Sequence, residues 1–240
     1  MYMQPVNLIC LHYAGGNAYS FNAFRPYLDG RLNMITPELP GRGLRYGEPL
    51  LTDVYAMAND VFSTIAHRLE EPFAIYGHSM GAIVAYLLAR RIEEEKLPPP
   101  VHLFCSGSRA PSVPCQSKYY NLPRAEFIAR LKELGGSPDE VLGNAEVMEF
   151  YIPIIRADFE AVETYQYQPG EKLNTPVTVL ISKDDRISYA DAEAWQQETY
   201  QPVSVLNFPG DHFFILDHAY DICRVIMRRL LTARLREASR

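Results

Sequence analysis

The chain has 240 residues, of which 48% are hydrophobic and 22% are charged. This composition is typical of a folded globular protein and excludes a wholly disordered chain. The net charge of -6 gives a surface that repels phosphate backbones, so nucleic acid is not an expected partner. The four cysteines show neither C-x-x-C pairing nor metal-ligand spacing, and no apolar stretch is long enough to cross a bilayer. We therefore expect a soluble, cytoplasmic protein with free thiols, no metal site and no membrane contact.

Short apolar runs alternate with helical patterns along the chain. Six runs are candidate strands, at residues 6–11, 32–36, 73–76, 101–106, 177–182 and 203–207. Thr52 is the expected N-cap of the helix that follows the second run. Because the runs are apolar without strict alternation, they are typical of strands covered on both faces in a parallel sheet. The order of elements predicts an α/β fold of the doubly wound type, with residues 1–240 in a single domain.

One long segment, at about residues 107–170, interrupts this alternation. It opens with a proline-rich stretch and continues with an apolar stripe that predicts a helix ending at residues 135–138, whose letters are GGSP. Residues 139–164 predict a further helix, kinked or broken at Pro153. An insertion of this length is too long for a plain connector, so it is either a substrate lid or a packed structural subdomain. We favour the lid.

Residues 77–81, with the letters GHSMG, carry the strongest local signal for chemistry. They match the G-x-S-x-G pattern and lie between a predicted strand and a predicted helix, as a nucleophile elbow requires. The two glycines allow a sharp turn that exposes the hydroxyl of Ser79, the candidate nucleophile. The backbone N–H of Met80 then points toward negative charge that develops on a substrate. The glycine-rich loop after the first strand offers Ala14 as the second candidate oxyanion donor.

A serine nucleophile needs a base, and the base needs an acid that orients it. In hydrolases with this elbow, the acid and then the histidine follow the serine, in loops at the carboxyl ends of later strands. The run at 177–182 leads into Asp184 and Asp185, and the run at 203–207 leads into His212. His212 is therefore the candidate base, and either aspartate can be its orienting acid.

Dispersed segments of the chain together resemble the type II thioesterases, which are α/β-hydrolases that serve nonribosomal peptide and polyketide synthases. The matching segments are YAGG at 13–16, LPGRG at 39–43, GHSMG at 77–81, LGGSP at 134–138, RAD at 156–158 and PGDHFF at 209–214. The match covers nearly the whole chain, with Tyr13 where the family has histidine and Asp211 where it has glycine. The aspartate of the family's acid loop corresponds to Asp185, which Arg186 follows here in place of proline. The resemblance therefore selects Asp185 over Asp184.

The resemblance implies an α/β-hydrolase fold with a mostly parallel central sheet and a helical lid. It also implies an editing enzyme that hydrolyses acyl thioesters on the phosphopantetheine arms of acyl or peptidyl carrier protein domains. The residues implied are a triad of Ser79, Asp185 and His212, with Ala14 and Met80 in the oxyanion hole. The sequence shows no cofactor motif and this chemistry needs none, and the lack of a long heptad pattern predicts a monomer.

Two other functions are still compatible with the sequence, and the surface on which a carrier domain would dock is undecided. The same triad could serve a carboxylesterase or lipase that acts on free small esters, and a hydrolase fold can also bind a partner without catalysis. An acidic carrier domain could dock at one of two groups of arginines, or these could be solvated surface. The groups are Arg42 with Arg45, and the C-terminal Arg224, Arg228, Arg229, Arg234, Arg236 and Arg240.

Overall fold

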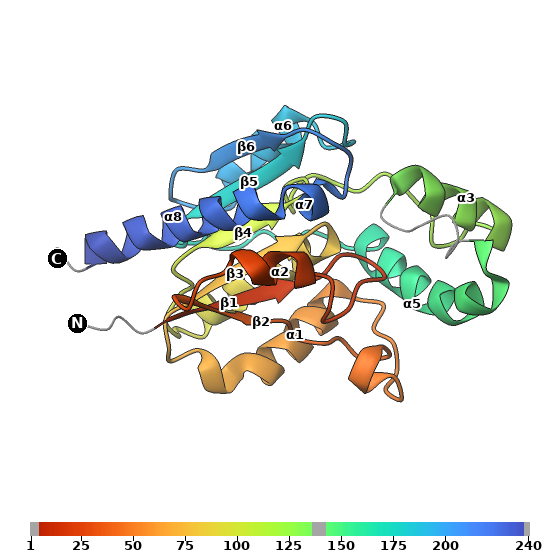
Figure 1. Ribbon diagram of the computed structural model, residues 1–240, viewed down its shortest axis with the longest axis horizontal. Coiled ribbons are helices and arrows are strands. Elements are labelled where there is room, and N and C mark those ends of the chain that lie inside the picture. Colours follow the sequence, from red (N-terminus) through yellow and green to blue (C-terminus); the bar gives the residue numbers. More distant parts are fainter. Residues whose placement is uncertain (1–4, 136–142, 238–240) are drawn as a thin grey trace.

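The computed structural model describes residues 5–135 and 143–237, and its centre is a six-stranded parallel sheet (Figure 1). The strands are β1 (Val6–Leu11), β2 (Leu32–Ile35), β3 (Phe73–His78), β4 (Leu103–Ser106), β5 (Val177–Ser182) and β6 (Ser204–Phe208). Their order in the sheet is β2-β1-β3-β4-β5-β6, and every neighbouring pair is parallel. All six predicted strands are present, and the predicted α/β fold is confirmed. Because the strands are parallel, the loops at their carboxyl ends share one edge of the sheet.

Helices cover both faces of the sheet. The helices are α1 (Val54–Ile65), α2 (Met80–Glu94), α3 (Arg124–Leu134), α5 (Ala145–Glu163), α6 (Tyr189–Glu193), α7 (Phe214–Asp217) and α8 (Ala219–Glu237), with 3₁₀ turns η1 (Asn22–Tyr27), η2 (Gly43–Arg45), η3 (Ala66–Arg68) and η4 (Ala194–Gln197). α1 and α2 pack against strand residues such as Ile9 and Ile75, whereas η1 and α8 pack against Leu8 and Tyr76 on the other face. This double cover explains why the strands are apolar on both sides. Among residues 5–135 and 143–237, no helix is both long and apolar enough to cross a bilayer.

Some element boundaries differ from the predicted ones because side-chain hydrogen bonds decide them. The N-cap of α1 is Asp53 and not the predicted Thr52, since the Asp53 carboxylate accepts a hydrogen bond from the N–H of Tyr55. β3 continues past its apolar run to His78, whose buried ring makes a hydrogen bond with Ser106 on the neighbouring strand. A polar residue can therefore extend a buried strand where it finds a partner.

The long insertion holds α3 and α5, which lie beyond the carboxyl edge of the sheet (Figure 1). They form a hydrophobic cluster of their own around Phe127 and Met148. α3 ends at Leu134, directly before the predicted GGSP stop. The rest of that stop and the start of the next predicted helix, residues 136–142, lie outside the described residues. The insertion thus has a hydrophobic cluster of its own, while Ala161 of α5 also belongs to the main core.

α5 begins at Ala145, where Asn144 caps it. The side chain of Asn144 accepts hydrogen bonds from the N–H groups of Glu146 and Val147. The helix continues through Pro153, so of the two expected outcomes at this proline, a kink or a break, the break is wrong. One continuous helix therefore runs from Ala145 to Glu163.

Three buried histidines make the stability of the fold depend on pH. Burial lowers the pKa of His12 and of His102 to about 4, helped by the positive charges of Arg42 and Arg229 respectively, and it lowers the pKa of His78 well below its ordinary value. Between pH 6.5 and about 4, the unfolded chain therefore binds more protons than the folded chain, so the free energy of unfolding falls as the pH falls. We expect a loss on the order of 1 kcal/mol per pH unit for each histidine in this window.

Urea denaturation at a series of pH values between 7 and about 5 measures this loss. The ring of His102 lies 2.8 Å from the hydroxyl of Thr178, a contact that glutamine can also make, so His102→Gln should fold and show a shallower pH slope. His67 is exposed, and His67→Gln serves as the matched control with an unchanged slope. Equal slopes in the wild type and both variants would show that the buried histidine does not cause the dependence.

Candidate active site

Ser79 occupies a sharp turn between β3 and α2, as the sequence predicts. Its backbone has a positive φ of 55°, which a residue other than glycine adopts only where the surrounding structure enforces it. A Cβ atom on Gly77 would collide with the carbonyl group of Gly81, and a Cβ atom on Gly81 would collide with the carbonyl group of Leu11. Close backbone approach therefore requires glycine at both positions. The turn holds the Ser79 side chain above the edge of the sheet.

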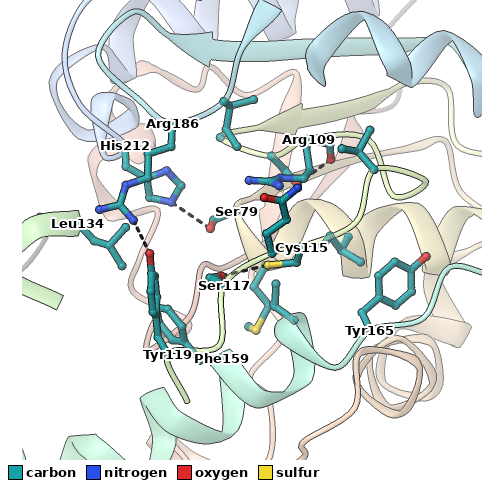
Figure 2. Close-up of a pocket in the computed structure, with 18 of the residues that line it drawn as sticks. Ser79, Arg109, Cys115, Ser117, Tyr119, Leu134, Phe159, Tyr165, Arg186 and His212 are labelled. Carbon is teal, nitrogen blue, oxygen red and sulfur yellow. Dashed lines mark hydrogen bonds between the residues drawn. The ribbon is translucent and has the colours of Figure 1, made fainter. Parts of the chain in front are cut away.

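Three side chains from separate loops form a hydrogen-bonded chain at this edge (Figure 2). The hydroxyl of Ser79 donates to Nε2 of His212 over 3.0 Å, and Nδ1–H of His212 donates to Asp185 over 2.8 Å. The side chains of His212 and Asp185 are only 16% and 4% exposed. In this geometry the imidazole can take the proton of the hydroxyl while the carboxylate fixes its tautomer. The parallel sheet thus brings together the three residues that the sequence suggests.

Asp185, and not Asp184, lies against His212. One carboxylate oxygen of Asp185 accepts from Nδ1 of the histidine, and the other accepts from the backbone N–H of Arg186 over 2.6 Å. Asp184 is exposed, and its backbone N–H donates to the carbonyl oxygen of Gly210 in the histidine loop. The geometry favours the aspartate that the family resemblance selects.

The backbone around Ser79 offers two N–H groups for an oxyanion. The N–H of Gly15 donates to a carboxylate oxygen of Asp158, and the N–H of Gly16 donates to the carbonyl oxygen of Tyr13. By contrast, among the described residues the N–H groups of Ala14 and Met80 donate to no other protein group. Unoccupied donors at the first turn of α2 and in the adjacent loop are what an oxyanion hole requires. Ala14 and Met80 therefore remain the candidate donors.

A second contact between a serine and a histidine lies inside the sheet, between β3 and β4. Nδ1 of His78 is 2.9 Å from the hydroxyl of Ser106, which also lies 2.8 Å from the hydroxyl of Tyr76. His78 and Ser106 are fully buried, and neither lines the cavities that reach Ser79. Because the pair lies outside both cavities, we assign it a structural role inside the sheet, where Ser106 gives a partner to Nδ1 of His78 and to the hydroxyl of Tyr76.

Two cavities meet at the nucleophile. The larger has a volume of about 620 Å³ and the smaller of about 320 Å³. Both are lined by Ser79 and His212, and both are covered by Leu134 at the end of α3 and Phe159 of α5. A substrate carbonyl at Ser79 therefore has space on two sides.

A buried ion pair ties α5 to the loop that carries Ala14. The guanidinium of Arg42 donates two hydrogen bonds of 2.7 Å to the carboxylate of Asp158, and the two side chains are 3% and 0% exposed. Asp158 also accepts from the N–H of Gly15 over 2.7 Å, and Arg42 donates to the carbonyl oxygen of Gly16 over 3.2 Å. These contacts fix the backbone beside the candidate oxyanion donor. The sequence analysis identifies the segments at 39–43 and 156–158 as family motifs, but no sequence pattern predicts that Arg42 and Asp158 contact each other.

We expect Asp158→Ala to lower the free energy of unfolding by about 3–5 kcal/mol, because it leaves the charge of Arg42 buried without its partner. The double change Asp158→Leu with Arg42→Met should cost less than the single one, since it removes both charges. Urea denaturation measures both values. Asp60→Ala is the control, because its pair with Arg45 is more exposed and should contribute less than about 1 kcal/mol. Equal losses for Asp158→Ala and Asp60→Ala would contradict the importance of the buried pair.

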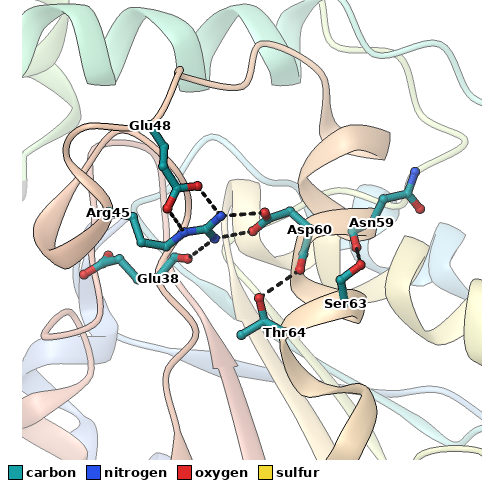
Figure 3. A network of polar contacts seen from close by, with 7 residues as sticks. All are labelled: Glu38, Arg45, Glu48, Asn59, Asp60, Ser63 and Thr64. Carbon is teal, nitrogen blue, oxygen red and sulfur yellow. Dashed lines mark hydrogen bonds and ion pairs between the residues drawn. The ribbon is translucent and has the colours of Figure 1, made fainter.

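The guanidinium of Arg45 is already surrounded by acceptors (Figure 3). It makes two hydrogen bonds with Asp60, two with Glu48 and one with the carbonyl oxygen of Glu38. Because Arg42 is buried and Arg45 is compensated by two carboxylates, neither offers free charge to a partner. The structure therefore does not favour docking of an acidic carrier at these two arginines. Docking at the C-terminal arginines stays a prediction.

Within the described part of the chain, no three histidine, cysteine, aspartate or glutamate side chains gather as a metal site.

The chain matches the thioesterase domain family over residues 6–230. It belongs to the thioesterases. The enzyme is 37% identical to the gramicidin S biosynthesis protein GrsT of Aneurinibacillus migulanus over 227 residues, which are 94% of this chain and 89% of that protein.

Solved structures place the thioesterase more narrowly. It is 34% identical to BorB, the type II thioesterase from the borrelidin biosynthetic cluster, with a TM-score of 0.87 over 96% of this chain and 94% of BorB. It is 28% identical to ClbQ from the colibactin NRPS/PKS pathway, with a TM-score of 0.91 over 97% of this chain and 99% of ClbQ. The thioesterase is thus a type II thioesterase of nonribosomal peptide and polyketide pathways, with the α/β-hydrolase fold. This excludes the alternative of a binding protein without catalysis.

Proposed function

We propose that this thioesterase hydrolyses acyl thioesters on the phosphopantetheine arms of acyl or peptidyl carrier domains, and so clears stalled or wrongly loaded carriers. The observation that carries the proposal is the hydrogen bond between Ser79 and His212 at the junction of two cavities. The names of the relatives support the pathway, since GrsT serves gramicidin S biosynthesis and ClbQ a colibactin NRPS/PKS pathway.

In the proposed acylation step, Nε2 of His212 takes the proton of Ser79 as its oxygen attacks the thioester carbonyl carbon. The N–H groups of Ala14 and Met80 stabilise the negative charge on the carbonyl oxygen, and each is worth about 10²–10³ in turnover. The C–S bond then breaks, and the protonated His212 gives its proton to the departing thiolate. The acyl group is left as an ester on Ser79. Asp185 keeps Nδ1 protonated and stabilises the imidazolium throughout.

The proposed deacylation step repeats this chemistry with water. His212 takes a proton from the water as its oxygen attacks the acyl-serine carbonyl carbon, and then returns that proton to Ser79. The product is the free acid. The insertion at residues 107–170 acts as a lid in this proposal: α3 and α5 form their own cluster and cover the nucleophile, so they can open for the carrier arm and exclude water from the site.

A panel of acyl-loaded carrier proteins tests the proposal, with the released acid measured by mass spectrometry. Each thioester is compared with an oxygen ester of the same acyl group on the same carrier. We expect release from the thioester at a higher kcat/KM than from the oxygen ester or from free small esters. The reverse order, with free esters preferred, would assign the same triad to a carboxylesterase instead.

A further inference from the structure

The two cavities that meet at Ser79 differ in charge. The larger cavity is lined by four cationic side chains, Arg109, Lys118, Arg130 and Arg186, against one acid, Asp185, which is engaged with His212. The described lining of the smaller cavity contains no lysine, arginine, aspartate or glutamate. A ligand that reaches across Ser79 therefore meets a cationic environment on one side and an uncharged one on the other.

Two of the cations are held together at the edge of the larger cavity. Arg186 follows the triad acid and donates to the hydroxyl of Tyr119 over 2.9 Å (Figure 2). The guanidinium of Arg130 lies 5.8 Å from the centre of the Tyr119 ring. One carboxylate, Glu133, serves both: it is 2.6 Å from Arg130 and 3.7 Å from Arg186. Lys118 is exposed next to the tyrosine. Arg130, Arg186 and Lys118 together carry more positive charge than Glu133 balances, and their side chains are exposed to solvent. This arrangement favours an anion at the opening of the larger cavity.

The smaller cavity has the opposite character. Besides the residues shared with the larger cavity, its wall consists mainly of apolar and aromatic side chains. These are Tyr13, Leu131, Val147, Met148, Tyr151, Ile155 and Phe213. Such a wall favours hydrocarbon and penalises a charged group that finds no partner.

A phosphopantetheine thioester has two arms that leave its carbonyl carbon, and only one of them carries a phosphate. We propose that the larger cavity receives the pantetheine arm, with its phosphate against Arg130 and Arg186, and that the smaller cavity receives the acyl chain. This inference rests on the proposed function and adds the direction in which the substrate lies across Ser79. The carrier domain then sits outside the larger cavity, beside α3 and the loop of Asp185.

The phosphate itself is the probe for the first half of the inference. The same acyl group is presented on pantetheine and on phosphopantetheine, and kcat/KM is measured for both. Two partly exposed ion pairs should favour the phosphorylated substrate by about tenfold in the wild type at low salt, and less at high salt. In the double variant Arg130→Gln with Arg186→Gln, the ratio should fall to about one. Glu133→Gln should raise it, because it removes the competing carboxylate.

Arg31→Gln is the matched control, since Arg31 is also an exposed arginine paired with an acid, Asp29, but lies before β2 at the opposite edge of the sheet. Its ratio should equal that of the wild type. A wild-type ratio of one, or a preference that survives in the double variant, overturns the phosphate assignment. If neither thioester is hydrolysed by the wild type, the proposed function itself fails, so the two failures are distinguishable.

Chain-length dependence tests the second half. Val147 lines only the smaller cavity and Val113 only the larger one, and both are half-buried. Val147→Trp should lower kcat/KM for a decanoyl thioester at least tenfold relative to an acetyl thioester, with the phosphate ratio preserved. Val113→Trp should affect the two acyl lengths equally. The opposite pattern, in which Val113→Trp alone discriminates between chain lengths, would reverse the assignment of the cavities.

Discussion

Replacement of Ser79 by alanine is expected to lower kcat for acyl-carrier hydrolysis by about 10⁴–10⁶-fold. The hydroxyl is the group that would form the acyl bond, and its hydrogen bond of 3.0 Å to His212 is the route by which its proton leaves. No other described hydroxyl lies within hydrogen-bonding distance of His212. Release of acid from a loaded carrier, followed by mass spectrometry, measures the loss.

Ser106→Ala is the control for this experiment. Ser106 also contacts a histidine, but it is buried under the site and touches neither cavity. Its loss should cost about 1–3 kcal/mol of stability, because it leaves His78 and Tyr76 without this partner, and change kcat by less than about tenfold. If Ser79→Ala kept more than a tenth of the wild-type rate, or if Ser106→Ala were equally inactive while folded, the nucleophile would have to be reassigned.

Asp185→Asn is expected to lower kcat by about 10⁴-fold, because asparagine can donate to Nδ1 and so stabilise the wrong tautomer of His212. The neighbouring exchange, Asp184→Asn, should change kcat by no more than a few-fold, since its carboxylate is exposed and makes no contact with the imidazole. The pair differs by one position and by one atom in each side chain, so the comparison isolates the contact with His212.

Circular dichroism and urea denaturation of both variants exclude a folding defect as the cause. The dependence of kcat/KM on pH gives a further measurement, which a purely structural role of the aspartate would not affect. We expect this profile to shift in Asp185→Asn and to stay unchanged in Asp184→Asn. Similar values of kcat in the two variants would mean that the orientation of the His212 imidazole does not depend on the carboxylate of Asp185.

Much of the fold could be predicted from the sequence, because its signals are local. The strands at Val6–Leu11 and Val177–Ser182 agree with the predicted runs at both ends, since each is a continuous apolar segment closed by polar or glycine residues. The elbow at Ser79 was predictable for a similar reason: its two glycines are required by contacts within a short stretch of chain and with the neighbouring strand. Ser79, His212 and the choice between two aspartates followed from the rule that loops after parallel strands meet at one edge, and the family resemblance then selected Asp185.

What could not be predicted depends either on the detailed local backbone or on contacts between distant segments. The helix cap fell on Asp53 instead of Thr52 because both residue types can cap a helix and only the local backbone selects one. Arg42 looked like a surface cation, whereas burial against Asp158, a residue of the insertion, makes it part of the interior. The division into a cationic and an apolar cavity has no sequence signature at all, because each wall combines side chains from several loops and helices.

Covalent labelling with a fluorophosphonate tests the central claim most directly. The reagent reacts with a serine only where a base withdraws its proton and donors stabilise the developing charge, so it reports the assembled site and not the serine alone. Peptide mapping of the labelled enzyme by mass spectrometry should place a single phosphonyl group on Ser79, and prior incubation with an acyl-carrier substrate should slow the labelling. An unlabelled wild-type enzyme, or a label on another residue with Ser79 unmodified, would contradict the account.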